Sequence, residues 1–184
     1  MSMRWQFMLV PAAIVTSAPA MAGAHYLTLK QAQELIFPGE TFKSDFRSLS
    51  DEQMKQIFDA SEVTVWNRKV RVWEVSNGGW FFLDQVHGKD DWVAYAVGIN
   101  PDGSVKSIEI LECWERYNQI RHPAWRAQFV GAKHGEFKGA SRGRFIEDTE
   151  IQNITGTTLS AIHVAEGVRR VLATFALIIA PEQL

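Results

Sequence analysis

The sequence predicts a single domain of the α+β class, with a central antiparallel β-sheet flanked by helices. Three observations support this prediction. Several short segments between residues 63 and 111 have strand-like apolar patterns, and turn residues separate them. Helical patterns precede and follow these segments. The 184 residues, of which 46% are hydrophobic and 22% charged, suit one globular domain with a sizeable core.

Residues 1–22 predict a secretory signal peptide. Arg4 supplies the positive start, a short apolar stretch from Phe7 to Val15 follows, and Ala20-Met21-Ala22 offers small residues for cleavage after Ala22. Ala24 is a second cleavage position, and an uncleaved anchor remains an alternative. We therefore expect residues 25–184 to form the mature domain, in the periplasm or on the outer face of the cytoplasmic membrane.

Two helices are expected next. The first covers residues 26–37, with Thr28 as N-cap and Gln31 at the capping-box position, and Pro38-Gly39 ends it. The second covers residues 50–60 and begins with the capping box that Ser50 and Gln53 form.

The strand pattern then starts with a predicted hairpin, whose strands at residues 63–66 and 70–75 flank the turn at 67–69. Three more strands are expected at residues 80–86, 92–99 and 105–111, separated by turns at 87–90 and 100–103. Short turns between consecutive strands imply antiparallel pairing. The apolar tail at 171–180 is too short to span a bilayer, and a buried helix or a final strand are both compatible with it.

The composition argues against several functions. A net charge of −2 gives no reason to expect nucleic acid as a partner. The single cysteine, Cys113, can form neither an internal disulfide nor a multi-cysteine metal site, and the five histidines lack metal-ligand spacing, so no metal is expected. The seven Trp and eleven Phe suit either an aromatic-lined site or a well-packed core.

The segment from Ile154 to Ser160 has the most specific chemistry in the sequence. It places four hydroxyl side chains and one glycine directly before an apolar run at residues 162–172. Such a glycine turn leading into a helix can bind a phosphate through unpaired backbone N–H groups, hydroxyls and the helix dipole. An ordinary helix N-cap is the alternative. The candidate phosphate-binding residues are Thr155, Gly156, Thr157, Thr158 and Ser160.

This segment also resembles the attachment motif of the FMN-binding domain family, whose domain occurs in the C subunit of the Na+-pumping NADH:quinone reductase and the G subunit of the Rnf complex. The family motif reads approximately Asp-x-x-Ser/Thr-Gly-Ala-Thr, and its last Thr carries FMN through a phosphoester that a separate flavin transferase installs. The resemblance implies that Thr158 is the attachment residue. The chain departs from the motif at Gln152, which replaces the acid, and at Thr157, which replaces Ala.

Other stretches follow the family pattern in the same order. They are the opening segment at 26–39, the Asp-Gly turn at 102–103 with the strand after it, and the segment at 123–131 that contains Gln-Phe-x-Gly. The loop between the last two corresponds to a segment that faces the flavin in the family, which implies flavin contacts for Glu115, Arg116 and Tyr117. Trp125 and Phe129 are candidates for ring contacts, although their spacing also suits the core.

The resemblance implies an FMN-carrying electron-transfer protein rather than a stand-alone enzyme. Its partners would be the flavin transferase and a membrane or periplasmic redox protein. The altered residues Gln152 and Thr157 keep a second function open, a secreted structural or binding module of the same fold without flavin. A flavin enzyme with its own small substrate is a third alternative, and the sequence has no Gly-x-Gly-x-x-Gly fingerprint for a nicotinamide cofactor.

Overall fold

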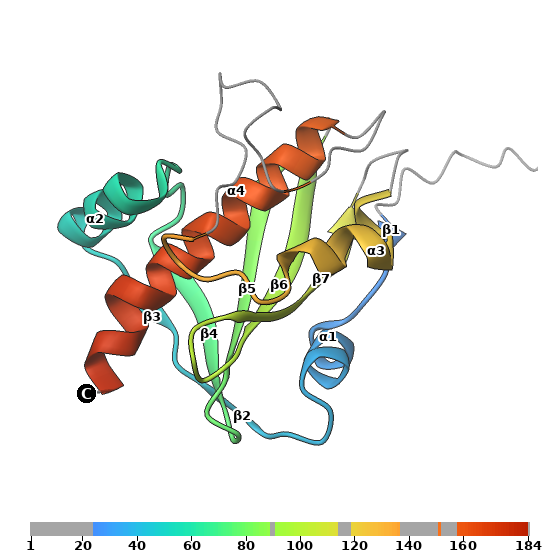
Figure 1. The fold of residues 1–184 in the computed structure, drawn as a ribbon, viewed down its shortest axis with the longest axis horizontal. Helices are drawn as coiled ribbons and strands as arrows, with labels where there is room; N and C mark the ends of the chain where they lie inside the picture. Colours follow the sequence, from blue (N-terminus) through green and yellow to red (C-terminus); the bar gives the residue numbers. More distant parts are fainter. Residues whose placement is uncertain (1–23, 89–90, 114–118, 137–150, 152–157, 184) are drawn as a thin grey trace, which may run out of the picture.

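The computed structural model describes residues 24–88, 91–113, 119–136, 151 and 158–183. Its centre is an antiparallel sheet with the strand order β1-β7-β6-β5-β4-β2, in which β4 also pairs with β3 (Figure 1). The strands are β1 (Ala24–His25), β2 (Phe42–Ser44), β3 (Arg47–Ser48), β4 (Lys69–Val75), β5 (Trp80–His87), β6 (Trp92–Ile99) and β7 (Val105–Cys113). The helices are α1 (Leu29–Ile36), α2 (Asp51–Ser61), α3 (Pro123–Arg126) and α4 (Thr158–Thr174), and three short helical turns are η1 (Gln119–Arg121), η2 (Ala127–Phe129) and η5 (Ala180–Gln183). This arrangement confirms the predicted α+β class.

Helices cover both faces of the sheet. Strand β6 shows the alternation: Val93, Tyr95 and Val97 belong to the apolar cluster that contains α4, whereas Ala96 belongs to the cluster that contains α1. Helix α4 crosses the central strands and has α2 beside it (Figure 1). The sheet therefore separates two apolar layers, which we call the α4 layer and the α1 layer.

The predicted N-caps of the first two helices are confirmed, although α1 begins at Leu29 and not at residue 26. The Thr28 and Ser50 side chains accept from the backbone N–H groups of Gln31 and Gln53, and each Gln side chain accepts from the cap residue's N–H in return. These reciprocal bonds satisfy backbone donors that the first helical turn leaves unpaired. Local sequence alone therefore fixes where α1 and α2 begin.

The predicted strands at 80–86, 92–99 and 105–111 are also confirmed. Strands β5 and β6 pair without a break from Trp80 opposite Ile99 to His87 opposite Trp92. In the turn between β6 and β7, the Gly103 N–H donates to the Asn100 carbonyl oxygen at 2.9 Å. Gly103 has a φ of 83°, which an L side chain rarely adopts, so the glycine suits this turn.

The predicted hairpin at residues 63–66 and 70–75 is wrong in its first half. Residues 62–66 form a loop, and β4 instead pairs with β2, β3 and β5. Val63 is buried and Val65 is partly buried in the α4 layer, so the alternating pattern reflects packing of a loop rather than a strand. The edge of β4 is filled by residues 42–48, whose short strands have little periodicity.

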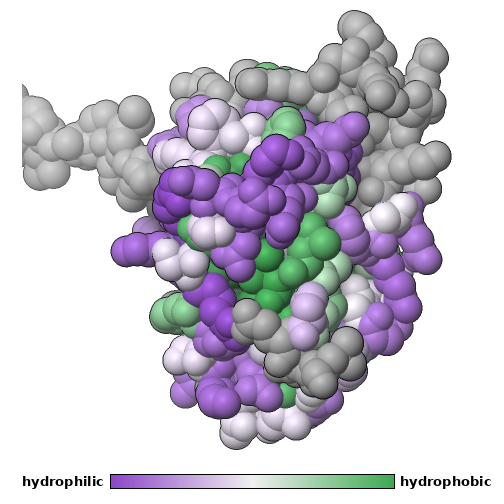
Figure 2. All heavy atoms as spheres, turned by 90° about the vertical axis from the view of Figure 1, so that its left-hand side faces the viewer, coloured by the Kyte–Doolittle hydropathy of each residue, from purple (hydrophilic) through white to green (hydrophobic). Residues whose placement is uncertain are grey.

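The apolar tail continues the last helix. A π-helical stretch, η4 (Phe175–Ile179), follows α4 directly, and Phe175, Ile178 and Ile179 are buried. Of the two alternatives for residues 171–180, the buried helix is therefore confirmed. Figure 2 shows the side of the molecule that carries α2 and the C-terminal half of α4, where an apolar area lies among hydrophilic side chains.

Candidate functional site

Helix α4 begins at Thr158, the residue for which the resemblance implies FMN attachment. The helix is 17 residues long, and its first turn carries no acidic side chain. Its N-terminal N–H groups and the positive end of its dipole would both favour a negatively charged phosphate there. The Thr158 side chain is partly exposed, which leaves it accessible from outside the domain.

Ser160 has a different environment from Thr158. It is 0% exposed and lies within the packed part of α4. The other predicted phosphate-binding residues Thr155, Gly156 and Thr157 lie outside the described residues, as do Gln152 and the predicted flavin contacts Glu115, Arg116 and Tyr117. Thr158 and Ser160 are thus the two predicted site residues that the structure places, and they share the first turn of one helix.

Helix α4 is held firmly by its apolar face. Val164, Ala165, Val168 and Leu172 are each 0–1% exposed and belong to the α4 layer. A site on such an element has a defined position, because the helix cannot shift without losing this packing. The middle of α4 therefore has a defined position against the sheet, and the helix axis carries this constraint toward Thr158.

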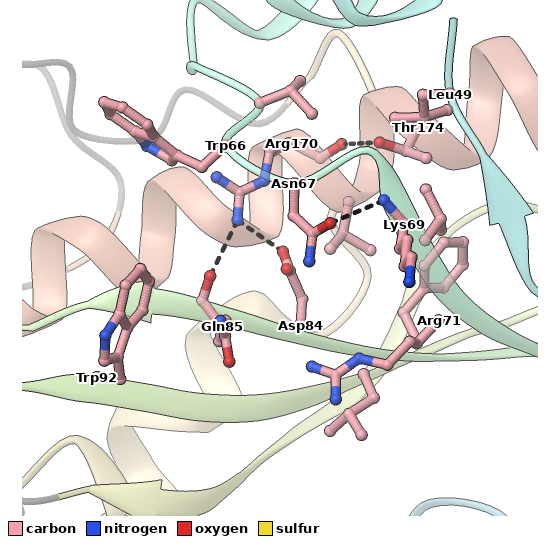
Figure 3. Close-up of a pocket in the computed structure, with 15 residues that line it drawn as sticks. Leu49, Trp66, Asn67, Lys69, Arg71, Asp84, Gln85, Trp92, Arg170 and Thr174 are labelled. Atoms are coloured by element: carbon pink, nitrogen blue, oxygen red, sulfur yellow. Dashed lines mark hydrogen bonds and ion pairs between the residues drawn. The ribbon is translucent and has the colours of Figure 1, made fainter.

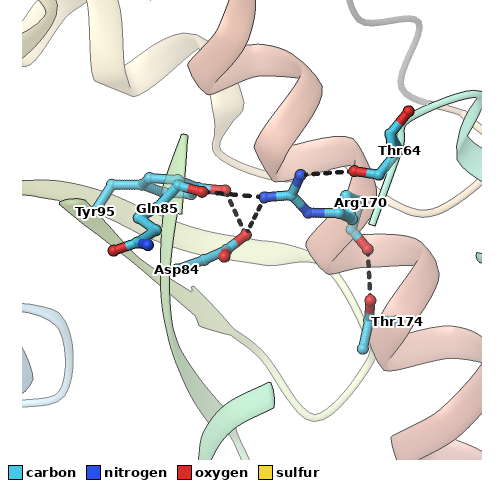
Figure 4. Close-up of polar contacts among 6 residues, drawn as sticks. All are labelled: Thr64, Asp84, Gln85, Tyr95, Arg170 and Thr174. Atoms are coloured by element: carbon cyan, nitrogen blue, oxygen red, sulfur yellow. Dashed lines mark hydrogen bonds and ion pairs between the residues drawn. The ribbon is translucent and has the colours of Figure 1, made fainter. Parts of the chain in front are cut away.

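A buried polar network fixes α4 to the sheet. The Arg170 guanidinium donates to an Asp84 carboxylate oxygen at 2.7 Å, and the Tyr95 hydroxyl donates to the same oxygen at 2.8 Å (Figure 4). Arg170 also donates to the backbone oxygens of Thr64 at 3.1 Å and Gln85 at 3.3 Å. The network joins α4, β5, β6 and the loop at 62–66.

The protonation states in this network follow from its geometry. Burial raises the pKa of Tyr95, and the charge of Asp84 raises it further, so Tyr95 remains a hydroxyl donor at neutral pH. Burial opposes the charge of Arg170, but Asp84 and Tyr95 outweigh this effect and raise the pKa of Arg170. Arg170 is 8% exposed, and its donors are directed to protein acceptors, which makes it a structural cation.

The sequence did not single out Arg170. Arg170 lies within the apolar run at residues 162–172, where the pattern as a whole predicts a helix. Gly167, Arg170 and Thr174 follow one another at helical spacing, and all three are buried in the structure. The sequence signal for a buried arginine was therefore its position between two smaller residues on the same helix face.

Trp125 and Phe129, the candidates for ring contacts, lie in the core. They are 4% and 0% exposed, and their ring centroids are 5.1 Å apart in an edge-to-face arrangement. The core alternative for this pair is therefore confirmed. Their segment forms a short helix, α3 followed by η2.

Two further searches cover only the described part of the chain. No group of three or more His, Cys, Asp or Glu side chains among these residues is placed to hold a metal ion. Among the same residues, no helix combines the length and the apolar character needed to cross a membrane.

Comparison with known proteins shows that the part of the chain that contains the site matches a protein family. Residues 88–173 match the family described as FMN-binding domain. The matched range includes β6, β7, α3 and all but the last residue of α4, so it contains the start of α4 at Thr158. A search of curated proteins finds no match to the chain.

Proposed function

The chain contains an FMN-binding domain over residues 88–173, and from this premise we propose that it is an extracytoplasmic electron-transfer protein with FMN linked to Thr158 by a phosphoester. The match to the family indicates FMN as the cofactor. The observation that carries the finer proposal is the position of Thr158, a partly exposed residue at the start of α4 inside the matched range.

The start of α4 fits a phosphate. It offers helix N–H groups, the positive dipole end and the Thr158 hydroxyl, and no carboxylate in the first turn repels an anion. When bound, FMN supplies a ring that accepts and releases electrons, and the protein supplies its position and surroundings. The role we assign to Thr158 is to anchor the phosphate, and the role of the buried face of α4 is to keep that anchor in place.

We propose export across the cytoplasmic membrane on the basis of residues 1–22, which have the charge and apolar pattern of a signal peptide. Delivery to the periplasm would place the domain on the same side as its redox partner and the flavin transferase. We expect no substrate chemistry of its own, because an electron carrier needs only a flavin that its partners can approach.

The second candidate is a structural or binding module that has the same fold and carries no covalent flavin. The observation in its favour is the pair of departures at Gln152 and Thr157. A transferase that recognises an acid at the first position and Ala at the second would modify such a chain less well.

The test is the intact mass and visible spectrum of the full chain, co-expressed with a flavin transferase and purified from the cell envelope. We expect yellow protein with the added mass of one phosphoester-linked FMN, and loss of both in Thr158→Ala. Thr157→Ala is the comparison variant, because it removes the neighbouring candidate hydroxyl and gives the Ala of the family motif, so the covalent mass should be lost only in Thr158→Ala. The same mass reports whether residues 1–22 are removed.

Two results would contradict the proposal. Flavin absorbance without added mass would mean that FMN binds without a covalent bond. A colourless wild-type protein, made beside a transferase that modifies another substrate in the same cells, would favour the module without flavin.

A further inference from the structure

A second site lies on another part of α4. A cleft of about 530 Å³ opens between the loop at 62–66, α4 and the adjoining ends of β5 and β6. A separate hollow of about 230 Å³, which Lys69 and Arg71 also line, adjoins this cleft at Trp66, Trp92 and Arg170. We call the larger of the two, the 530 Å³ cleft, the Trp66–Trp92 cleft.

Its most unusual feature is a pair of exposed tryptophans. Trp66 is 79% exposed and Trp92 is 46% exposed. Figure 3 shows both indoles on the same side of Arg170, one from the loop before β4 and one from the start of β6. A single exposed apolar side chain is common, whereas two large aromatic rings at one cleft provide flat surfaces on which a planar ring can stack.

Four side chains of the cleft lining can offer acceptors, beside the indole N–H donors of Trp66 and Trp92. His163 Nδ1 lies 2.5 Å from the His87 carbonyl oxygen, and His87 Nδ1 lies 2.8 Å from the Gly88 carbonyl oxygen. A carbonyl can only accept, so in the neutral imidazoles Nδ1 carries the proton and Nε2 is an acceptor. The carboxylates of Glu62 and Glu166 also line the cleft and accept hydrogen bonds.

The buried cation of the cleft lining is already neutralised. Arg170 donates to Asp84, Thr64 and Gln85, as described above. The remaining charges of the lining are those of Glu166 and of Glu62, whose carboxylate lies 3.7 Å from the Arg169 guanidinium. An anionic ligand would therefore meet two carboxylates, whereas an uncharged ligand with O–H donors would find acceptors.

The cleft also lies away from the proposed FMN anchor. His163, Glu166, Gly167 and Arg170 are spaced along one face of α4. Thr158 precedes His163 by five residues, which at roughly 100° per residue places the two side chains about 140° apart around the helix axis. The phosphate anchor and the cleft thus use different faces of the same helix.

From these observations, we propose that the Trp66–Trp92 cleft binds an uncharged planar aromatic molecule that bears hydroxyl donors, of the phenol or hydroquinone class. The ring stacks on the indoles of Trp66 and Trp92, and the hydroxyls donate to acceptors such as His163 Nε2. This inference does not depend on flavin attachment, since every group it uses belongs to the protein and none lies at Thr158.

The test uses flavin-free Thr158→Ala protein, so that its result is independent of FMN. Hydroquinone is titrated under argon and followed by calorimetry and by the indole N–H signals of Trp66 and Trp92 in NMR spectra. The matched ligands are 1,4-dimethoxybenzene, which keeps the ring and lacks the donors, and the anion 4-hydroxybenzoate. We expect saturable shifts of both indole signals with hydroquinone, and at least about tenfold weaker binding of the other two.

Protein variants separate stacking from hydrogen bonding. Trp66→Ala should weaken hydroquinone binding about tenfold, and its high exposure means that folding should be unaffected. Phe58→Ala is the control, because Phe58 is a 47% exposed aromatic outside the cleft lining and its loss should change nothing. His163→Phe should weaken hydroquinone several-fold and leave dimethoxybenzene unchanged.

Three results would overturn the inference. In the first, hydroquinone leaves both indole signals unmoved. In the second, Trp66→Ala binds it as tightly as the parent protein. In the third, FMN-loaded wild-type protein no longer binds hydroquinone, which would mean that the flavin ring occupies the cleft.

Discussion

At the residue scale, Asp84 carries the most consequential contact of the polar network. It accepts from both Arg170 and Tyr95, and it is the only one of the acceptors described for Arg170 that bears a charge. A buried cation without a counter-charge is strongly unfavourable, because the interior replaces little of its lost hydration. The main contribution of Asp84 to the stability of the fold is therefore to neutralise the buried charge of Arg170.

Asp84→Ala should lower the free energy of unfolding by about 3 kcal/mol, since it leaves the Arg170 charge buried without its partner. Tyr95→Phe should lower it by only about 1 kcal/mol, because the Asp84–Arg170 pair survives the loss of one neutral hydrogen bond. Urea unfolding at pH 7, followed by circular dichroism, measures both values.

The double variant Asp84→Ala with Arg170→Met serves as the control for this prediction. Removal of both charges should recover part of the stability that Asp84→Ala loses. Equal losses for Asp84→Ala and Tyr95→Phe would show that the ion pair contributes no more than an ordinary hydrogen bond.

Residues could be predicted from the sequence where their chemistry is local. Thr158 lies inside a continuous motif, and its place at the start of α4 follows from that motif. Arg170 and Asp84 are 86 residues apart, and nothing local to either one marks the other as its partner. The same holds for Trp66 and Trp92, which belong to one cleft only because the loop at 62–66 and the start of β6 come together in the fold.

At the element scale, the predictions that succeeded rest on turns and caps. The capping boxes at Ser50 and Thr28 and the turn at Gly103 involve bonds between residues close together in the chain. The prediction of a strand at 63–66 failed because alternating apolar residues indicate only that one side of a segment is buried. A loop that packs against a helix can give the same pattern. The short strands β2 and β3 form by pairing with the edge of β4, and no local sequence pattern predicts this pairing.

The position of α4 depends on the absence of a side chain at Gly167. A Cβ built there would overlap the Tyr95 hydroxyl oxygen and would lie 2.9 Å from Val86 Cγ1. Gly167→Ala should therefore lower the free energy of unfolding by about 1–3 kcal/mol, although Ala normally favours a helix over Gly by about 1 kcal/mol. Thermal unfolding of the variant beside wild type measures the sign and the size.

The Tyr95→Phe background is the control for the Gly167 prediction. This background lacks the hydroxyl oxygen that a Cβ at position 167 meets first, so Gly167→Ala should be less destabilising there than in the wild type. A stabilised Gly167→Ala protein would mean that helix propensity outweighs contact with the sheet, and that α4 can move away from β6 at little cost.

At the scale of the whole molecule, both proposed sites lie on the side of the sheet that α4 covers. Thr158 and the Trp66–Trp92 cleft both involve α4 and its layer, whereas α1 packs on the opposite face over Phe81, Ala96 and Leu111. Gly98 allows this close packing, because a Cβ there would overlap the Ile36 side chain. We infer that the α1 layer contributes stability and that the α4 layer also contributes the sites.

A matched pair of substitutions tests this division. Val75 lies in the α1 layer and Val86 lines the Trp66–Trp92 cleft, and both are buried, at 1% and 7% exposure. Each change to Ala should lower the free energy of unfolding by roughly 1–3 kcal/mol, since each removes two methyl groups from a packed layer. Urea unfolding of the two variants measures this loss.

The two variants should differ in ligand binding, measured by calorimetry at a temperature where both are fully folded. Val86→Ala removes part of a cleft wall and should weaken hydroquinone about threefold or more, whereas Val75→Ala should leave the affinity unchanged. An equal loss of affinity in both would mean that ligand binding follows global stability. The two layers would then not be independent of each other. The lower affinities of the cleft variants would have to be attributed to a lower stability of the whole domain.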